Sequence, residues 1–373
     1  MEIQCNGIII KKALMKIIDL YIIRKFLGTF LFMIGAFVLI AIIVDVSENI
    51  DDLVKTKASF WQIVSEYYLN FCFYFGTLLS PFIIFLSIIW FTSKLSQQSE
   101  MIAMLSGGIT YKRIILPYFI SATLLVILSL WLSHVVVPRA NKRKLDFEIT
   151  YLKDPITVTE RHAHREIAPG TIAYFYSFHP ASLSGDNFSL ERWEGNTLRY
   201  KLMGSSATYL PDTKQWRITN AIIREWPKDS VQRVYERAVI DTILPMDEQD
   251  FGLRAEITAA MSFDELSTFI EEQRLGGTGR VAQFELEKYN RTAVPFSIYV
   301  LTLIGVSVAS RKQRGGIGLH LMLAVIIGFV FVFISRMMAV SSMNLGLSAA
   351  WAVWVSNILF TFLGLFLYSK AQK

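Results

Sequence analysis

Long apolar stretches alternate with polar segments along the chain, and their lengths predict its architecture. A helix needs roughly 20 apolar residues to cross a hydrocarbon core of about 30 Å. Six stretches approach this length, and they predict membrane spans at about residues 26–44, 69–91, 114–137, 293–309, 317–340 and 348–368. The fourth is the shortest, and residues upstream of it, from Tyr289, would extend it. The pattern therefore predicts three spans on each side of a large polar insert.

The insert shows a different pattern, in which short runs rich in β-branched and aromatic residues alternate with turn residues. From about Pro155 to Thr258, the runs predict strands at Ile172–Phe178, Leu198–Leu210, Lys214–Trp226 and Val231–Ile240. A turn is predicted at Ser184–Asn187, and Pro211–Thr213 predicts a hairpin turn. Many short strands without helices between them favour an all-β sandwich or an open barrel, such as a jellyroll.

The end of the insert returns to a helical pattern. Ser262 and Glu265 have the spacing of a capping box, which predicts a helix from there to about Arg274. A second helical stretch, Val281–Arg291, leads into the fourth span. The chain is thus predicted to consist of an N-terminal membrane half (residues 1–137), a β-rich insert with a helical return (138–292) and a C-terminal membrane half (293–373).

Composition and charge agree with a membrane protein of defined orientation. With 53% hydrophobic residues, the chain is too apolar for an ordinary soluble globule. Lysines and arginines gather before the first span, in the links at 92–113 and 310–316, and after the last span, whereas the link at 45–66 is mainly acidic. Positive charge marks cytoplasmic segments, so both termini are predicted to be cytoplasmic and the insert periplasmic. The net charge of +6 reflects these clusters, which lack the aromatic interleaving of a nucleic-acid surface.

Catalytic and cofactor motifs are sparse. The sequence has no Walker loop, and its glycine-rich pieces at Gly276–Gly279 and Gly315–Gly318 do not follow a strand and open a helix. His162 and His164 would share one face of a strand, but a metal site needs further ligands. The two cysteines are too far apart in the predicted topology to form a disulfide. We therefore expect no metal and no cofactor.

Several side chains are candidates for lipid contact, each with an ordinary structural alternative. Arg336 lies near the outer end of the fifth span, where it either reaches the interface or meets an anionic group in a cavity. Lys55 and Lys57 are either solvated or contact phosphate. In the β domain, an apolar groove for acyl chains would be lined by aromatic residues that are also typical of a sandwich core, namely Tyr174, Tyr176, Tyr209 and Trp216.

The segment between the second and third spans is amphipathic. After Glu100, the apolar residues Met101, Ile102, Met104 and Leu105 follow at helical spacing, and Gly107–Gly108 then break the pattern. The spacing predicts a short cytoplasmic helix at about residues 97–108. Such a helix either docks a partner or lies at the interface without one.

Four short segments, together with the arrangement of spans and insert, carry a resemblance that covers essentially the whole chain. They are Asp19–Phe26, Gln98–Met104 with Gly108, Ala207–Tyr209 with Trp216–Ile218, and Tyr289–Pro295. In these features the chain resembles the LptF/LptG (YjgP/YjgQ) permease family of the lipopolysaccharide export ABC transporter. The resemblance implies an α-helical membrane protein with six helices (3+3) and a periplasmic, all-β jellyroll-like domain between helices 3 and 4.

The resemblance also implies a function and partners. Members pair in the inner membrane around a lipid cavity that is gated by spans one and five, so a second six-span permease is expected. A cytoplasmic ATPase dimer (LptB-like) would hydrolyse ATP, and periplasmic bridge proteins (LptC/LptA-like) would receive lipopolysaccharide from the β domain. The chain itself would be a non-catalytic transport subunit. The segment at 97–108 would be its coupling helix, with ATPase coupling assigned to Glu100, Met101, Met104, Leu105 and Gly108.

One region departs from the family pattern. Family exporters place basic residues near the outer end of span one to meet lipid A phosphates, whereas this chain has Asp45, Glu48, Asp51 and Asp52 before Lys55 and Lys57. The departure leaves the identity of the lipid open. Two alternatives to the exporter are a membrane scaffold or sensor that passes no lipid, and an enzyme that modifies envelope lipids.

Overall fold

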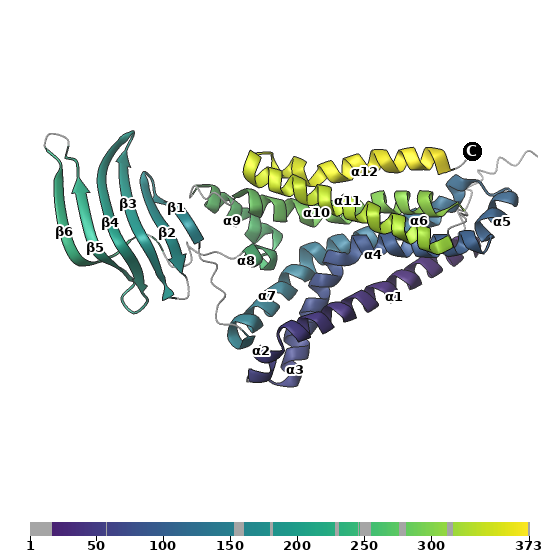
Figure 1. The fold of residues 1–373 in the computed structure, drawn as a ribbon, viewed down its shortest axis with the longest axis horizontal. Coiled ribbons are helices and arrows are strands. Elements are labelled where there is room, and N and C mark those ends of the chain that lie inside the picture. The colour runs from purple at the N-terminus through teal and green to yellow at the C-terminus, as the bar shows by residue number, and fades with distance from the viewer. Residues whose placement is uncertain are drawn as a thin grey trace, which may run out of the picture.

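The structure is a computed structural model that describes residues 17–56, 58–152, 160–179, 182–227, 231–244, 246, 255–275, 281–311 and 316–371. Within these residues, six helices are long and apolar enough to cross a membrane, and a six-stranded antiparallel sheet lies between the third and the fourth. Figure 1 shows the sheet beyond one end of the helices and the short helix α5 (Glu100–Ser106) at the other end. The predicted fold class is confirmed.

The six long helices are continuous over most of their length. They comprise α1 (Ile17–Glu48), α4 (Leu69–Gln97), α6 (Tyr111–Trp131), α10 (Val281–Ala309), α11 (Gly316–Leu345) and α12 (Ala349–Ala371). Short segments extend them at the sheet end, namely α2 (Ile50–Lys55), α3 (Phe60–Gln62), α7 (Val137–Phe147) and π-helical turns at Ile63–Tyr68, Leu132–Val136 and Glu148–Leu152. The helical stretch before the fourth span and the span itself form one helix, α10, with Pro295 inside it.

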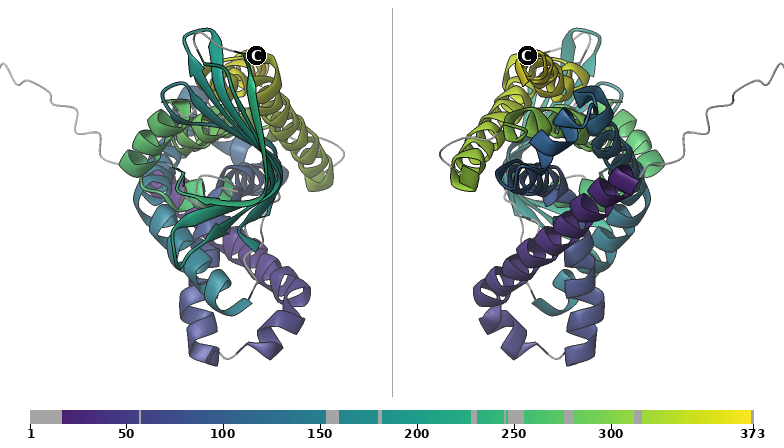
Figure 2. Two further views of the ribbon diagram at one scale, coloured as in Figure 1. Left: turned by 90° about the vertical axis from the view of Figure 1, so that its left-hand side faces the viewer. Right: turned by 90° about the vertical axis from the view of Figure 1, so that its right-hand side faces the viewer.

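Burial divides the spanning helices into two groups. In its most apolar 18-residue window, α10 has 61% of its residues buried within the chain, and the spans that contain α6 and α4 have 50% and 44%, whereas α11 has 17% and α1 has 6%. We call α4, α6 and α10 the central helices, and α1 and α11 the lateral helices. Figure 2 views the bundle along its length and shows both lateral helices at its periphery. Their outward faces are apolar and have no cover within the described chain.

Small residues allow the central helices to approach closely. A Cβ atom at Gly305 of α10 would lie 2.9 Å from Cγ2 of Ile88 in α4. A Cβ atom at Gly328 of α11 would lie 2.7 Å from Cε2 of Phe82. Without a hydrophobic driving force between helices in lipid, such close packing is the main source of their association. Gly35 of α1 is different, because a Cβ there meets nothing within 4 Å.

The insert forms one curved sheet in which every strand pairs with its neighbour in sequence. Its strands are β1 (Glu160–Ala168), β2 (Thr171–His179), β3 (Ser184–Glu194), β4 (Thr197–Leu210), β5 (Gln215–Glu225) and β6 (Arg233–Thr242). The predicted hairpin between Leu198–Leu210 and Lys214–Trp226 is confirmed by the β4–β5 pairing, in which Tyr209 lies opposite Trp216. A single six-stranded layer with one buried face is consistent with a jellyroll-like domain.

The turn predicted at Ser184–Asn187 is wrong, because these residues begin strand β3. Gly185 is needed there for space, since a Cβ atom would lie 2.3 Å from Cδ1 of Phe175 on the neighbouring strand. Asn187 has a φ of 50°, which is a local irregularity within the strand. Glycine and asparagine therefore serve close packing and a strand irregularity here, although the same residues are typical of turns.

The return from the sheet to the membrane is helical. The strand pattern was expected to continue to Thr258, but Ala255–Ala260 form a helix, α8. The predicted capping box opens α9 (Phe263–Leu275) and is confirmed by hydrogen bonds from the Ser262 N–H to Oε2 of Glu265 (2.8 Å) and from the Glu265 N–H to Oγ of Ser262 (3.3 Å). Burial of Leu266, Ile270 and Phe284 packs α9 onto α10.

Arg291 of α10 joins the membrane bundle to this helical return. Its side chain is only 6% exposed, and its guanidinium donates to the carbonyl oxygens of Thr258 and Met261, both at 2.8 Å. These carbonyls lie at and just beyond the end of α8, and the Thr258 carbonyl also accepts a hydrogen bond from the Met261 N–H at 3.3 Å. A buried arginine that satisfies two backbone acceptors fixes the position of the β domain's last segment on α10.

Candidate functional site

The short helix α5 lies at the end of the bundle farthest from the sheet, between α4 and α6 (Figure 1). It begins after Ser99, which adopts a φ of 61° and so turns the chain out of α4. It ends at Gly107 and Gly108, where Gly108 has a φ of 82° that glycine adopts without a steric cost. The break expected from the two glycines is therefore where the helix stops.

The side chains that α5 exposes are not the ones that helical spacing assigned to a docking face. Met101, expected on a docking face, is fully buried in the core formed by α1, α4 and α6, so it cannot contact a partner in this structure. Met104 and Leu105 are half-buried against the same core. The outward surface instead consists of exposed Ile102 (48%), Ala103 and Ser106, beside half-buried Glu100. The seven-residue helix thus presents a small, mixed surface with one carboxylate.

Polar contacts tie this end of the lateral helix α1 to its neighbours. Tyr21 of α1 donates a hydrogen bond from its hydroxyl to Oε2 of Glu100, at 3.0 Å. Two residues earlier, Asp19 forms an ion pair with Arg113 at the start of α6. The buried residues of α1 are Asp19, Ile22, Phe26 and Phe30, all in the half nearer to α5. This half is therefore fixed, whereas the remainder of α1 has no fully buried side chain.

The other lateral helix is tied to α4 by a buried polar pair. His320 of α11 is fully buried, and its Nδ1 lies 2.9 Å from Oγ of Ser93. One turn further along α4, Ser96 donates from its hydroxyl to the carbonyl oxygen of Ser310, at the end of α10. An ionisable residue inside a membrane bundle costs free energy, so its position facing a partner on α4 is informative. Both lateral helices thus connect to the α4–α5 segment.

Arg336 lies on the open face of the lateral helix α11. It is exposed, and apolar Phe333, Met337 and Val340, which are also exposed, surround it on the same helix. Within this chain Arg336 therefore does not face an internal cavity. It points either to the interface or to a space completed by another molecule, as both sequence-based alternatives allow.

At the sheet end, the acidic residues of α1 are partly engaged by aromatic side chains. Tyr67 donates to Oδ1 of Asp45 at 3.1 Å. Lys144 of α7 lies over the rings of Tyr67 and Phe71, with Nζ 5.6 and 5.9 Å from their centroids, and pairs with Glu148 at 3.1 Å. Lys144 supplies positive charge close to the acidic residues that depart from the family pattern. The sequence did not single it out.

The two lysines proposed for phosphate contact are not both placed. Lys55 is the last residue of α2, is exposed and lies outside the aromatic cluster around Lys144. Lys57 lies outside the described residues. The exposure of Lys55 suits a solvated side chain and a phosphate contact equally.

The four aromatic residues expected to line a groove in the β domain lie on two different faces. Trp216 is buried together with Tyr209 and Phe175, whose ring centres lie 5.3 and 5.8 Å from its own. The Trp216 indole N–H donates to the carbonyl oxygen of Met246 at 3.1 Å, so its polar atom is satisfied. These two residues form the domain core. Tyr174 and Tyr176 lie on the face of β2 that points away from this core. The prediction of one groove lined by all four aromatic residues is therefore wrong.

The histidine pair shares that opposite face, as its spacing predicted. His164 lies 4.4 Å from the ring centre of Tyr174, and His162 is hydrogen-bonded to the Tyr174 hydroxyl at 3.0 Å. Within the described residues, no group of three or more histidine, cysteine, aspartate or glutamate side chains is arranged to hold a metal ion. The arrangement is an aromatic and imidazole surface patch.

The last strand leaves an open edge. Among the described strands β6 pairs only with β5, and nearly all of its residues are exposed, including Val234, Tyr235 and Val239. Arg217 of β5 binds Asp241 of β6 through two hydrogen bonds of 2.9 and 2.8 Å, which lower the pKa of the Asp241 carboxyl. An exposed edge with unpaired backbone groups is a site for strand addition.

A comparison with protein families decides the identity of this architecture. The family model described as lipopolysaccharide export system permease LptF/LptG matches residues 20–370, almost the whole chain. The chain belongs to the LptF/LptG family. A search of curated proteins found no significant match.

Membership of the LptF/LptG family defines the role of the molecule in outline. The chain is a multi-pass inner-membrane permease component of a lipopolysaccharide export system, and such components are not the catalytic part of a transporter. The permease works with partner proteins of that system. Within this LptF/LptG chain, the structure adds the polar ties of the lateral helices, the open face that carries Arg336 and the exposed edge of β6.

Proposed function

We propose that the chain is one of two paired permease subunits that extract lipopolysaccharide from the outer leaflet of the inner membrane. The observation that carries the proposal is the asymmetry of the lateral helices. Near α5 they are fixed by Tyr21–Glu100, Asp19–Arg113 and Ser93–His320, whereas toward the sheet α1 has no fully buried residue. A helix that is held by buried side chains at one end, and at the other has the Tyr67–Asp45 hydrogen bond but no buried side chain of its own, suits a lateral opening to the membrane.

The outward surface of α5 is proposed to dock a cytoplasmic ATPase dimer of the LptB type. Glu100 would bind a basic group of the ATPase, and Ile102, Ala103 and Ser106 would supply the close contact surface. The positive-inside distribution of charge supports a cytoplasmic position for this end and a periplasmic position for the sheet. ATP-driven movement of α5 would reach α1 through the Tyr21 hydroxyl and α11 through α4.

The open faces of α1 and α11 are proposed to meet a second six-span permease and, between the two subunits, the lipid cargo. An arginine on an apolar helix face costs roughly 2.5–3.5 kcal/mol at the membrane centre and less toward the ends. A cavity that contains the anionic groups of lipopolysaccharide would remove this cost for Arg336. The pairing partner, either a related chain or a second copy, would complete that cavity.

The β domain is proposed to pass the lipid to periplasmic bridge proteins of the LptC/LptA type. The exposed edge of β6 offers backbone donors and acceptors to a strand of the next domain. The face of the sheet that carries Phe175 and Trp216 is apolar, as acyl chains require, but both side chains are fully buried in this structure, so lipid would reach this face only if the domain opened. Both features lie beyond the end of the bundle opposite to α5 (Figure 1).

The experiment that tests the proposal is Glu100→Lys in the full chain, purified with its partners from the native membrane. We expect loss of the co-purifying ATPase, because the substitution places a cation where a basic group would bind, and a loss of at least about tenfold in lipopolysaccharide release. Glu272→Lys on exposed α9 makes the same charge change far from α5 and is the control. Unchanged ATPase association in Glu100→Lys would contradict the proposal.

A further inference from the structure

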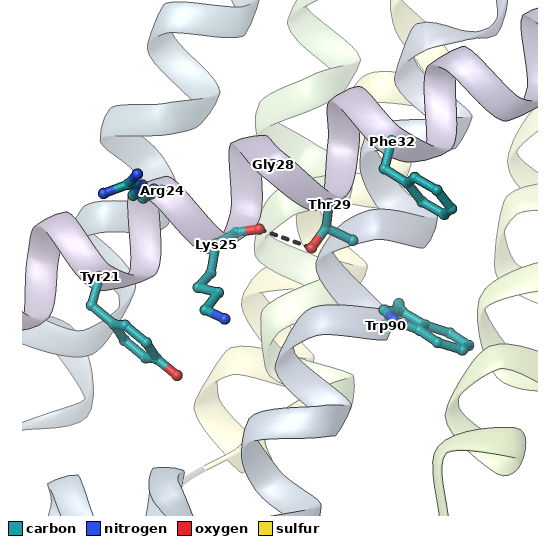
Figure 3. A pocket seen from close by; sticks show the side chains of 7 residues that line it. All are labelled: Tyr21, Arg24, Lys25, Gly28, Thr29, Phe32 and Trp90. Atoms are coloured by element: carbon teal, nitrogen blue, oxygen red, sulfur yellow. Dashed lines mark hydrogen bonds between the residues drawn. The ribbon is translucent and has the colours of Figure 1, made fainter.

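A groove runs between the α5 halves of α1 and α4, apart from the outer-leaflet path proposed for the cargo. Its volume is about 490 Å³, and Tyr21, Lys25, Gly28, Thr29, Phe32 and Trp90 line it. A smaller recess of about 160 Å³ adjoins it and adds Lys94 of α4 and Gln98, the residue after α4. Figure 3 shows Tyr21 and Lys25 leaving α1 in the same direction, toward the space beside Trp90.

The polar part of the groove is cationic and offers several donors. Lys25 and Lys94 come from different helices and line the same recess, beside the Thr29 hydroxyl and the Gln98 amide. Among the described residues, neither lysine has a carboxylate within ion-pair distance. Arg24 also lines the larger groove. Tyr21, which also lines the groove, donates its hydroxyl hydrogen bond to Glu100.

The other part of the groove is apolar. Phe32 and Trp90 are exposed, 76% and 41% respectively, and lie next to Gly28. A Cβ atom at Gly28 would meet nothing within 4 Å, so the glycine leaves open space between the two aromatic residues and the cations. A groove that is cationic at one end and apolar at the other is complementary to a molecule with an anionic head and an acyl chain.

We propose that this groove binds an anionic phospholipid of the leaflet on the α5 side, with its phosphate held by Lys25 and Lys94 and one acyl chain against Phe32 and Trp90. Basic pockets between spanning helices on the cytoplasmic side are typical sites for anionic headgroups. Lysine ammonium groups bind phosphate as point charges, and the Thr29 hydroxyl is a further donor. The lipid would bridge α1 and α4 next to the Tyr21–Glu100 contact and so stabilise the fixed end of α1.

The phosphate chemistry would also suit free inorganic phosphate, but the apolar half of the groove favours the lipid. Phe32, Trp90 and Gly28 would have no role toward a soluble anion. An acyl chain covers apolar surface that water would otherwise contact, and this contribution scales with the area removed from water. Phosphatidylglycerol, phosphatidylcholine and inorganic phosphate therefore distinguish the two sources.

The test uses the full chain in nanodiscs of equal parts phosphatidylglycerol and phosphatidylcholine, followed by native mass spectrometry of retained lipid. We expect the unmodified chain to retain phosphatidylglycerol in preference to phosphatidylcholine, also with millimolar inorganic phosphate present. Gly28→Leu places a side chain in the groove, with a Cβ atom that meets nothing within 4 Å, and should abolish this preference. Gly35→Leu, on the same helix and also in open space, is the matched control and should behave like the unmodified chain.

The charge contribution is tested separately with Lys25→Gln and Lys94→Gln. Each should reduce retention of phosphatidylglycerol roughly fivefold, as expected for one cation near an anionic headgroup. Equal retention of the two lipids, or unchanged retention in Gly28→Leu, would overturn the proposal. Displacement of the lipid by inorganic phosphate would also overturn it, in favour of a soluble anion. The assay does not depend on export, so its outcome is independent of the proposed transport function.

Discussion

The lateral helices are more apolar in sequence than the central helices, yet they are less buried within the chain. α1 and α11 have mean hydropathies of 2.8 in their most apolar windows, above the values of 2.1 for α4 and 1.9 for α10. Nevertheless α4, α6 and α10 are the more buried helices. Inside a membrane, apolar character alone does not bring a helix to the centre, because lipid solvates an apolar face as well as another helix does. The packing of the helices against one another, rather than their apolar character, therefore distinguishes the central helices.

The largest expected effect comes from breaking the close packing of the central helices. Gly305→Leu places a side chain 2.9 Å from Ile88, so it should lower the free energy of unfolding by about 1–3 kcal/mol or more through overpacking. Thermal denaturation of the purified chain measures this change. Gly35→Leu on lateral α1 should remain within about 0.5 kcal/mol of the unmodified chain. Equal destabilisation by both substitutions would remove the distinction between central and lateral helices.

A smaller effect is expected where a lateral helix meets α5. Tyr21→Phe removes the hydroxyl that donates to Glu100 and leaves the ring in place. A lost hydrogen bond of about 1 kcal/mol should reduce the lipopolysaccharide released per ATP hydrolysed roughly fivefold. Association with the ATPase should persist, because Glu100 is unchanged.

The control for this substitution is Tyr299→Phe. It removes a similar exposed hydrogen bond, from the Tyr299 hydroxyl to Oγ1 of Thr123, between α10 and α6. It should leave release per ATP unchanged. If both substitutions reduced release equally, the Tyr21 contact would have no special place in coupling.

The smallest expected effect is on the stability of the start of α9, the helix that packs on central α10. Hydrogen bonds from the backbone and hydroxyl of Ser262 hold the pKa of Glu265 below its usual range. Because the folded pKa is lowered, the stabilisation is fully present above the unfolded pKa of about 4.3 and is lost as pH falls through the folded value. The protection factors of the amides at the start of α9, that is, the intrinsic exchange rate at each pH divided by the observed rate, should therefore decrease with acidification. Glu265→Gln should weaken this pH dependence, and an unaltered pH profile in that variant would contradict the assignment.

The sequence was sufficient for features that depend on neighbouring residues. Runs of apolar residues predicted the six helices, and the spacing of Ser262 and Glu265 predicted the start of α9, because these signals are local. The polar ties were not predictable in this way. Tyr21 and Glu100 are 79 positions apart, and Ser93 and His320 are 227 positions apart. Each pair exists only because the helices that carry it pack together.

The errors on α5 and in the sheet have a related cause. Helical spacing showed that Met101, Met104 and Leu105 lie on one side of α5, but not whether that side faces the core or a partner. The structure places Met101 inside. Alternation along β2 likewise separates Tyr174 and Tyr176 from Phe175, but a common groove was assumed for aromatic residues of both faces. The spacing of apolar residues shows which side chains share a face of a helix or strand. Tertiary packing determines whether that face meets the core, solvent or a partner.

The consecutive pairing of the six strands has a consequence for the order in which the protein is made. Every ladder joins strands adjacent in the chain, so the sheet needs no partner from later in the sequence to form. Short separations between contacting residues favour rapid folding. The membrane bundle is the opposite case, because α10, its most buried helix, is synthesised after the sheet. During synthesis the first three helices therefore remain without their central partner until the β domain has left the ribosome.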